Sequence, residues 1–403
     1  MIRTTVFWIF LCSFAFRAIA AESSWTQWLG EGRDGISNES GWSVDWPESG
    51  LPIAWEREIG IGFSSVSIAN GRLFTMGHKD GEETIYCLKQ NSGETIWTHN
   101  YASALVDNLY EGGPGATPTL DGDRVYTLGK EGQLLCLSAN DGTVVWQRDL
   151  QADLEVNLPE WGFNSSPTIV EDQLIVQGGR IVSYNKTDGE LLWKTSKHTA
   201  GYGCAEVFEQ DGKTMLATLD SDGLRILDAS NGKQLNAFPW PSPFHTNSTT
   251  PIVKDDTIYV STGYGVGCGK FQLTEGKLDL IYDNRKMRNH FNNSILYQGN
   301  LYGFDGNSNL GRVVQLVCMD HETGEVLWQQ RGLGCGSLMI ADGKLVVLSE
   351  DGQLVIAEAT GKEYKELARA EILDGRCWTV PVLLDGHVYA RNAQGRLVAV
   401  KLP

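Results

Sequence analysis

A short motif recurs along the chain and constrains its fold more than any other feature: a turn that contains Gly, three further residues and then Trp. In the copy at 141–146 it reads Asp-Gly-Thr-Val-Val-Trp, and other copies end at Trp97, Trp193 and Trp328. Trp97, Trp146 and Trp193 are separated by 49 and 47 residues. Between these copies, short alternating apolar runs are bounded by Gly, Asp and Asn. A period of this length predicts one four-stranded antiparallel unit per repeat.

A second motif precedes the tryptophan motif and supplies the first two strands of each unit. It reads DGDRVYTLG at 121–129, DGKLVVLSEDG at 342–352 and DGHVYARNAQG at 385–395. Asp-Gly and Asn-Gly provide the positive φ angles that two-residue hairpin turns require. Weaker copies of the tryptophan motif at 230–238, 274–282 and 359–367 fill the gaps between the clear ones.

Counting the strand sets predicts a closed ring of eight units. The sets begin near Phe63, Gly115, Phe163, Tyr202, Asn247, Phe291, Gly334 and Trp378. The last set ends before a fourth strand, whereas residues 51–58 carry Trp55 without partner strands of their own. Pairing the two ends removes exposed sheet edges. We therefore predict an all-β, eight-bladed β-propeller over 51–403, with four-stranded antiparallel blades and the N-terminal strand completing the last blade.

The first fifty residues divide into two segments. Residues 1–20 combine Arg3, an apolar core and a small-residue site at Ala18-Ile19-Ala20, which predicts a cleaved signal peptide. The apolar run is too short to span a membrane, and Leu11 before Cys12 does not fit a lipoprotein signal. Residues 21–50 form a lead-in segment. We expect a periplasmic or secreted protein without a membrane span.

The charge of the chain limits its partners. The formal net charge is −17, and loss of the two arginines of the signal peptide leaves 31 basic against 50 acidic residues, or −19. Such a protein repels nucleic acid and anionic lipid. We expect a small molecule or an envelope protein as partner, no nucleic acid, and a monomeric chain.

The tryptophan motif is similar to that of the pyrroloquinoline quinone (PQQ)-like repeat family. The stretches at 25–42 and 375–392 also look like secreted bacterial members of this family. WD40 blades are a poorer match, since the chain contains no Trp-Asp dipeptide. The resemblance covers about residues 25–403 and implies a propeller in which the repeat tryptophans dock between neighbouring blades: Trp55, Trp97, Trp146, Trp193 and Trp328.

The long, irregular segments should share one face of the propeller, opposite the tight Asp-Gly turns of each blade. Binding sites tend to lie on variable loops carried by a rigid scaffold. Candidate ligand- or cofactor-binding residues on this face are Asn164, Asn247, Arg288, His290, Asn292, Asn293, Arg376 and Trp378. Two alternatives remain open: small polar groups also suit the crowded inner strands, and the arginines could pair with surrounding acids.

The cysteines and one Asn-rich turn offer weaker signals. Cys87, Cys136 and Cys318 occupy the same third-strand position in three units, which indicates a small buried residue. Cys335 and Cys377 enter neighbouring inner strands, where they could form a disulfide or remain free thiols; Cys204 and Cys268 are undecided. Asp305, Asn307 and Asn309 alternate as in the start of a calcium loop, but Gly comes one place late and the closing Glu is missing. An ordinary Asn-rich turn is favoured there.

Three functions are compatible with these residues. The first is a ligand- or protein-binding scaffold in the periplasm. The second is a PQQ-dependent dehydrogenase of alcohols or sugars, with PQQ and calcium in the axial funnel. For that activity the resemblance implies a vicinal cysteine pair, a Glu/Asn metal set and an Asp base, and the chain has no vicinal cysteines. The third is an outer-membrane assembly factor of BamB type, although that family is normally lipid-anchored. The scaffold is favoured, and no catalytic residue is assigned.

Overall fold

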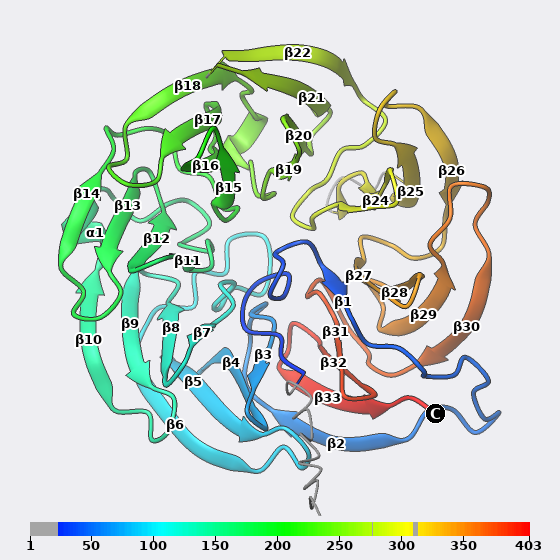
Figure 1. Cartoon of the computed structure of the whole chain (residues 1–403). Coiled ribbons are helices and arrows are strands. Elements are labelled where there is room, and N and C mark those ends of the chain that lie inside the picture. Colours follow the sequence, from blue (N-terminus) through cyan, green and yellow to red (C-terminus); the bar gives the residue numbers. More distant parts are fainter. Residues whose placement is uncertain (1–22, 276, 309–312) are drawn as a thin grey trace, which may run out of the picture.

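The computed structural model describes residues 23–275, 277–308 and 313–403 of the chain. Its strands form eight sheets that follow one another around a central axis in chain order (Figure 1). The fold is an eight-bladed β-propeller, and the number of blades predicted from the repeat is confirmed. The first strand of each blade begins a few residues after the start expected from the sequence.

Each blade contains four strands in meander order, numbered from the axis outward. The first four blades are formed by β3 (Ser67–Ala69), β4 (Arg72–Lys79), β5 (Glu82–Lys89), β6 (Thr95–Ala102); β7 (Thr119–Asp121), β8 (Arg124–Leu128), β9 (Gln133–Ser138), β10 (Val144–Asp149); β11 (Thr168–Val170), β12 (Gln173–Gln177), β13 (Ile181–Asn185), β14 (Leu191–Lys194); and β15 (Glu206–Gln210), β16 (Lys213–Leu219), β17 (Gly223–Asp228), β18 (Gln234–Pro239). Helix α1 (Leu150–Leu154) and a 3-10 turn (Pro243–His245) lie in the connections.

The remaining four blades repeat this order. They are formed by β19 (Ile252–Lys254), β20 (Thr257–Thr262), β21 (Gly267–Thr274), β22 (Lys277–Asn284); β23 (Ile295–Tyr297), β24 (Asn300–Asp305), β25 (Gln315–Asp320), β26 (Val326–Gln330); β27 (Ser337–Ala341), β28 (Lys344–Leu348), β29 (Gln353–Glu358), β30 (Glu366–Glu371); and β31 (Val382–Leu384), β32 (His387–Arg391), β33 (Arg396–Lys401) with β2 (Ile53–Glu58).

The tight turns have the backbone that the sequence requires. Asn70 and Gly71 have φ angles of 52° and 69°, and Asp342 and Gly343 have 50° and 67°. Two successive positive φ angles define the hairpin turn that matches the twist of the flanking strands. Gly, Asn and Asp tolerate this conformation, which explains why Asn-Gly and Asp-Gly mark the start of so many second strands.

A β-bulge turns the repeat tryptophan toward the neighbouring blade. In β10 the register against β9 shifts between Val144 and Trp146. Trp146 is consequently buried, while Val144 and Val145 stay exposed. The equivalent shift occurs beside Trp55 and Trp97, so the bulge is part of the repeat.

The indole of Trp146 packs against a turn of the next blade. A Cβ atom at Gly189 would lie 2.7 Å from the Cδ2 atom of Trp146, and the indole Nε1 donates to the Lys186 carbonyl at 3.0 Å. Corresponding contacts join Trp55 to Gly93 and the Gln90 carbonyl, Trp97 to Gly142 and the Ala139 carbonyl, and Trp328 to the Thr360 carbonyl. Trp193 packs on Gly232, but its Nε1 donates to Gln173 within its own blade.

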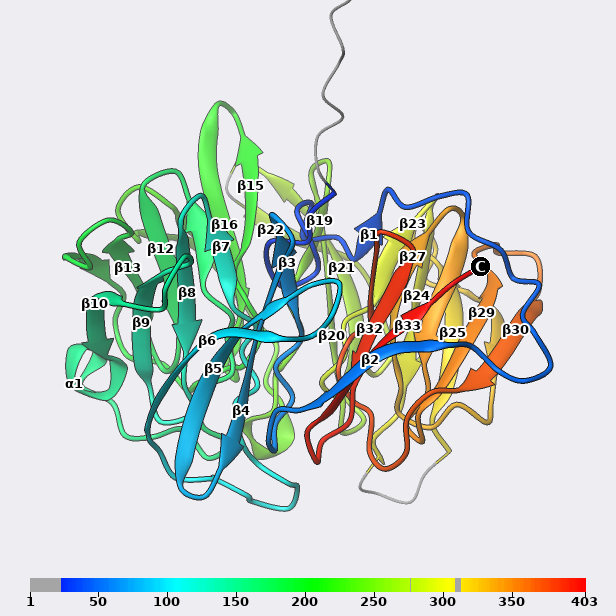
Figure 2. The ribbon, with the colours of Figure 1, turned by 90° about the horizontal axis from the view of Figure 1, so that it is seen from below.

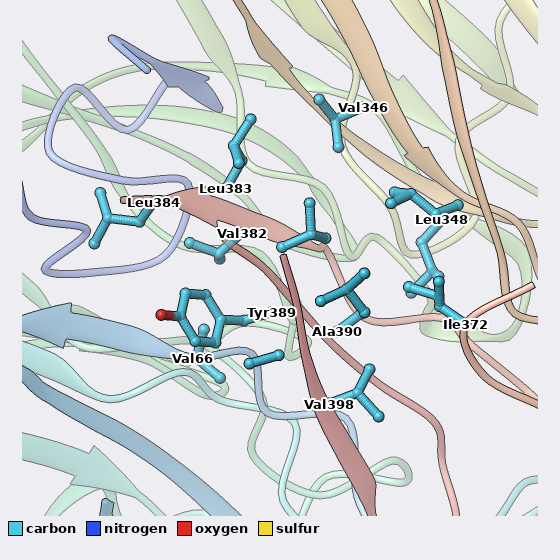
Figure 3. Packing of buried hydrophobic residues seen from close by; sticks show 14 of the residues in the cluster. Val66, Val346, Leu348, Ile372, Val382, Leu383, Leu384, Tyr389, Ala390 and Val398 are labelled. Atoms are coloured by element: carbon cyan, nitrogen blue, oxygen red, sulfur yellow. The ribbon is translucent and has the colours of Figure 1, made fainter. Parts of the chain in front are cut away.

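The two ends of the chain close the ring. Strand β2 pairs antiparallel with β33, with Trp55 opposite Ala399. The prediction that the N-terminal strand completes the last blade is therefore confirmed. Figure 3 shows the apolar side chains that pack across the last two blades, among them Val346, Leu348, Val382 and Tyr389. Each of these is almost wholly inaccessible to solvent, so apolar packing joins the seventh and eighth blades.

The lead-in segment belongs to the propeller. Trp25 forms a bridge with Ile68, the Thr26 carbonyl accepts from Leu120 N, and β1 (Ile36–Ser37) pairs parallel with β27. In the seventh blade β1 therefore adds a fifth, parallel strand beside the four-stranded antiparallel meander. Residues 25–37, called the strap below, cross the axis at the end where the first and second strands of each blade meet (Figures 1 and 2). They satisfy backbone groups at the inner strand edges.

Two expectations concern the location of the protein: a signal peptide and the absence of a membrane span. The predicted signal peptide, residues 1–20, lies outside the described residues. Within the ranges that the structure covers, no helix is long and apolar enough to cross a membrane.

The cysteines of the described chain are all buried free thiols, including Cys204, Cys268, Cys335 and Cys377. Cys87, Cys136 and Cys318 each lie opposite a repeat tryptophan in the strand register. Burial raises the pKa of Cys87 to about 12 and that of Cys136 to about 11. The thiols of Cys87 and Cys136 therefore stay protonated and unreactive.

Candidate functional site

A cavity of about 210 Å³ lies on the axis, on the side of the long connecting loops. Its walls come from segments that belong to different blades, including 101–115, 151–163, 239–247 and 283–291. At the opposite end of the inner strands, the strap contributes Trp28 to the lining. The cavity is therefore a funnel whose far end is covered by the strap.

Aromatic rings from successive loops form a continuous arc at this cavity, called the collar below. Neighbouring ring centroids lie 4.4–6.1 Å apart in the order Phe244, Tyr264, His290, Phe291, Trp378, Phe63, Tyr110 and Trp161. All of these rings except Phe244 line the cavity, as do Tyr202 and Trp28. Tilted, edge-on and stacked contacts at these distances are favourable for aromatic pairs, so the collar supports itself across several blades.

Trp378 is held in the collar by polar contacts on its outer side. Its indole Nε1 donates to Glu350 Oε1 at 2.9 Å, and Glu350 Oε2 accepts from the Cys335 backbone N–H at 2.9 Å. The guanidinium of Arg376 lies 4.4 Å from the ring centroid and forms an ion pair with Glu111 at 2.7 Å. These contacts fix the ring orientation and leave Arg376 neutralised.

A buried lysine supports the opposite side of the collar. Lys130 Nζ donates to Asn164 Oδ1 at 2.7 Å and lies 5.1 Å from the centroid of Tyr110. Burial lowers the pKa of Lys130 to about 7, although the nearby Glu83 favours the charged form. Glu83 itself accepts hydrogen bonds from Lys130 N at 2.9 Å and from Tyr101 Oη at 2.8 Å. The network orients Asn164 toward the cavity wall.

Three collar residues keep unused hydrogen-bonding atoms. His290 Nδ1, Tyr110 Oη and Trp161 Nε1 are buried and have no hydrogen-bond partner among the described residues. His290 Nε2 lies 3.1 Å from Tyr264 Oη. Burial lowers the pKa of His290 to about 4, so the ring is neutral at pH 7. A buried polar atom without a partner costs about 1–3 kcal/mol, and an entering group with oxygen atoms would relieve that cost.

The lining of the cavity carries no charged side chain among the residues described; it combines rings with Asn, Ser, Thr, Cys, Leu and Gly. An uncharged aromatic wall favours an uncharged ring over an anion. A cavity of roughly 150 Å³ is enough for benzene in a protein core. The axial cavity is larger, and it suits a single ring or a bicyclic group.

The structure separates the predicted ligand-binding residues into two groups. Asn164, His290 and Trp378 line the cavity. Arg288 instead pairs with Asp305 through both its Nε and its Nη2, each at 2.6 Å, and Arg376 lies behind Trp378 as described. Of the two interpretations left open for the arginines, the structure shows the ion pairs.

The three remaining asparagines bind backbone inside the ring. Asn247 Nδ2 donates to the Asp220 and Trp240 carbonyls, and Asn292 Nδ2 donates to the Gly336 carbonyl. Asn293 joins two blades, because its side chain accepts from Thr250 N and donates to Thr250 O, both at 3.1 Å.

Hydroxyl groups make similar links between inner strands of adjacent blades. Ser65 N donates to Thr117 Oγ1, Thr117 N to Ser166 Oγ, and Cys204 N to Thr250 Oγ1. The small polar side chains at these strand starts are therefore used by neighbouring backbone groups, which a crowded axis demands.

The residues present do not fit a calcium–PQQ centre. PQQ carries several carboxylates, and calcium takes about 6–8 oxygen ligands, usually with carboxylates among them. The cavity lining described offers neither a cation for the quinone nor an acid for the metal. Within the described ranges, no group of three or more His, Cys, Asp or Glu side chains could hold a metal ion.

The Asn-rich turn is engaged in protein contacts. Both oxygens of Asp305 accept from Arg288, and Asn307 Oδ1 accepts from Tyr264 N at 2.8 Å. Asn309 lies outside the described residues. Asp305 and Asn307 therefore support loops beside the collar, and we derive no step that involves a metal.

Most of the ring residues of the collar were not among the predicted ligand-binding residues. Phe63, Tyr110, Trp161, Tyr202 and Phe291 stand shortly before the first strand of a blade. Recurrence of an aromatic residue at the end of an entering loop is the signal that could have identified them.

Comparison with known proteins finds one matching family model. The family model described as outer membrane protein assembly factor BamB matches residues 81–314 and 307–402. No curated protein sequence matches the chain.

Similar solved structures share the fold at low sequence identity. BamB from Moraxella catarrhalis is 14% identical, with a TM-score of 0.65 over 87% of this chain and 99% of that chain. A quinohemoprotein alcohol dehydrogenase from Comamonas testosteroni is 12% identical, with a TM-score of 0.75 over 96% of this chain and 81% of that chain. The computationally designed Ika8 protein is 11% identical, with a TM-score of 0.61 over 87% and 99%. At these identities the comparison shows the fold alone.

Proposed function

The chain belongs to the family of the outer membrane protein assembly factor BamB, and from this premise we propose that it is an exported, monomeric binding propeller whose axial cavity receives one uncharged ring-shaped group. Export is supported by the signal-peptide pattern of residues 1–20, and an envelope location by the family description. The proposal includes no chemical step.

The collar is the observation that carries this proposal. Its rings form an unbroken arc around a cavity whose described lining is uncharged. Such a wall gains contact area with a flat apolar group and gives it no charge to neutralise. Hydrogen-bonding atoms of Tyr110, Trp161 and His290 remain to interact with the edge of that group.

The dehydrogenase alternative has less support from the same residues. A polyanionic quinone would have to enter a cavity that presents no cationic side chain in its described lining. The dehydrogenase among the similar structures shares the blade architecture at 12% identity. The described cavity lining of the present chain has no charged side chains that could bind PQQ or calcium.

The proposal is tested by titrating the purified mature chain with indole, a neutral bicyclic probe, and following the calorimetric heat. A fragment of this size should bind with a Kd of about 0.1–1 mM. PQQ with calcium is titrated in parallel with an artificial electron acceptor and alcohols.

Two variants localise the binding. Ser248 lines the cavity, and Ser248→Phe should fill it and abolish indole binding. Ser196 is exposed on a loop, and the matched variant Ser196→Phe should leave binding unchanged. Absence of indole binding, or binding that survives Ser248→Phe, would overturn the proposal. Saturable PQQ binding with dye reduction would establish the dehydrogenase instead.

A further inference from the structure

The mouth of the cavity carries the two most exposed large apolar side chains of the described chain. Leu109 is 79% exposed and lines the cavity, and Phe244 is 65% exposed. Phe244 packs edge-on against Tyr264 at 5.2 Å, and Tyr264 lines the cavity. Two loops from different parts of the ring thus present apolar groups to water beside one opening.

The backbone of both loops is strained where these side chains project. Leu109 has a φ of 61° and Phe244 a φ of 60°. Val106 and His245, in the same two loops, have φ angles of 53° and 52°. The left-handed region is costly for bulky and β-branched residues. The fold therefore accepts backbone strain and apolar exposure together at the mouth, which indicates a surface that a partner covers.

Negative charge accompanies the apolar rim. Asp107 and Glu160 are exposed, and in the described part of the chain neither carboxylate has a hydrogen-bond or ion-pair partner. Burial is the main cause that raises the pKa of Tyr110 and of Tyr202. The charge of Asp107 also raises the pKa of Tyr110, and the charge of Glu160 also raises that of Tyr202. The two carboxylates therefore lie within electrostatic reach of the cavity wall.

The cations near the collar are already engaged. Arg376 pairs with Glu111, and Arg288 pairs with Asp305. Lys130 is buried behind Tyr110, bound to Asn164. The mouth therefore combines an uncharged aromatic interior, an apolar rim and two unpaired carboxylates.

We propose that the group received by the cavity is an aromatic side chain of an extended polypeptide segment, with a basic residue beside it in sequence. This inference rests on the proposed function and specifies its ligand class. The aromatic side chain fills the collar as an anchor. The chain on either side of it covers Leu109 and Phe244, and the basic side chain meets Asp107 or Glu160. A free ring compound would leave the rim exposed and the carboxylates unpaired.

The test compares a peptide with its isolated anchor. The probe is a blocked peptide of glycine and serine with a central Lys-Trp-Lys, and the reference is N-acetyl-tryptophanamide, both titrated against the mature chain by calorimetry. The peptide should bind at least 10-fold more tightly than the reference. Replacing its Trp by Ala should abolish binding, and replacing both Lys by Glu should weaken binding at least 10-fold.

Variants of the protein identify the rim. Leu109→Ser and Phe244→Ser should each weaken peptide binding several-fold, and by a larger factor than they weaken the binding of indole. Leu280→Ser, on the outer strand β22 and 42% exposed in the native chain, is the matched control and should change neither. The double variant Asp107→Asn/Glu160→Gln should remove the preference for Lys over Glu in the peptide.

The outcomes separate the two proposals. If indole binds in the cavity but the peptide binds no more tightly than N-acetyl-tryptophanamide, the polypeptide assignment is wrong and the cavity serves a free ring compound. If neither indole nor the peptide binds, the proposed function itself fails. A peptide that binds equally well to Leu109→Ser and Phe244→Ser also contradicts the inference, because it would bind elsewhere.

Discussion

The contact between a repeat tryptophan and a turn glycine offers a direct measurement of what holds neighbouring blades together. Gly189 has a φ of 72°, and a Cβ atom there would meet Trp146 at 2.7 and 2.8 Å. Gly122 has a similar φ of 58°, but a Cβ atom there would meet nothing within 4 Å. Gly189→Ala and Gly122→Ala therefore share the backbone change and differ in the contact with the indole.

The expected magnitudes follow from these two geometries. A left-handed Ala costs about 1–2 kcal/mol, and the lower entropy of the unfolded chain returns about 0.4–1 kcal/mol. Gly122→Ala should thus lower the free energy of unfolding by about 0–1.6 kcal/mol. Gly189→Ala adds overpacking against a buried ring, which costs about 1–3 kcal/mol more. The difference between the variants isolates the docking contact, because the backbone terms cancel.

The assay is urea unfolding followed by both tryptophan fluorescence and far-ultraviolet circular dichroism. Coincident transitions with unchanged slopes would justify comparing free energies between the variants. Equal destabilisation by the two substitutions would refute the reasoning, since it would mean that the indole moves aside at no cost. A matching result from Gly142→Ala, which meets Trp97 at 2.6 Å, would extend the conclusion to a second pair of blades.

Three further measurements follow from the inner ring and the strap. Burial raises the pKa of Glu206 to about 8, although the charge of Arg33 opposes the shift. The native state therefore binds the Glu206 proton more tightly than the unfolded chain does. As the pH rises from 5 to 8.5, the free energy of unfolding should fall by at most about 1.4 kcal/mol per pH unit. That dependence should disappear in Glu206→Gln. Alkylation of Cys204, a cavity-lining thiol, by N-ethylmaleimide should slow when indole is added, and Cys204→Ser should remove the indole-sensitive adduct. Asn293→Ala should lower the free energy of unfolding by about 2–4 kcal/mol, because Thr250 N and O lose their partner inside the ring; a loss below 0.5 kcal/mol would show that water replaces it.

The blades could be predicted because each carries its own local signals. An Asp-Gly or Asn-Gly turn requires positive φ angles, and the bulge before a tryptophan such as Trp146 buries it against the next blade. These constraints act within a few residues and recur with the repeat. The strap could not be predicted in the same way. Strand β1 has only two residues, and its pairing with β27 depends on an inner strand edge some 300 residues later in the chain.

The candidate site was predicted in position but only partly in composition. The loops that form the cavity were expected on the correct face because turn lengths alternate along each blade. Of the polar residues predicted at the starts of inner strands, Asn164 lines the cavity, whereas Asn247 and Asn293 bind backbone groups that the ring must satisfy. Tyr110 and Trp161 lie in connecting loops at irregular distances before the first strands of their blades, so the repeat period does not reveal them.

This division of roles explains why the repeat motif says so little about function. The tryptophans dock blade to blade on the outer side, and the small polar residues join the inner strands, so both sets are occupied by the architecture. Chemistry at the axis must then come from side chains that the architecture does not use, which are those of the entering loops. In this chain the loop side chains that line the cavity are mainly aromatic, with no acid or arginine among the described lining residues. Exchange of those loop residues should change what the funnel binds while the blades continue to close, since Trp55, β2 and β33 lie outside the cavity lining.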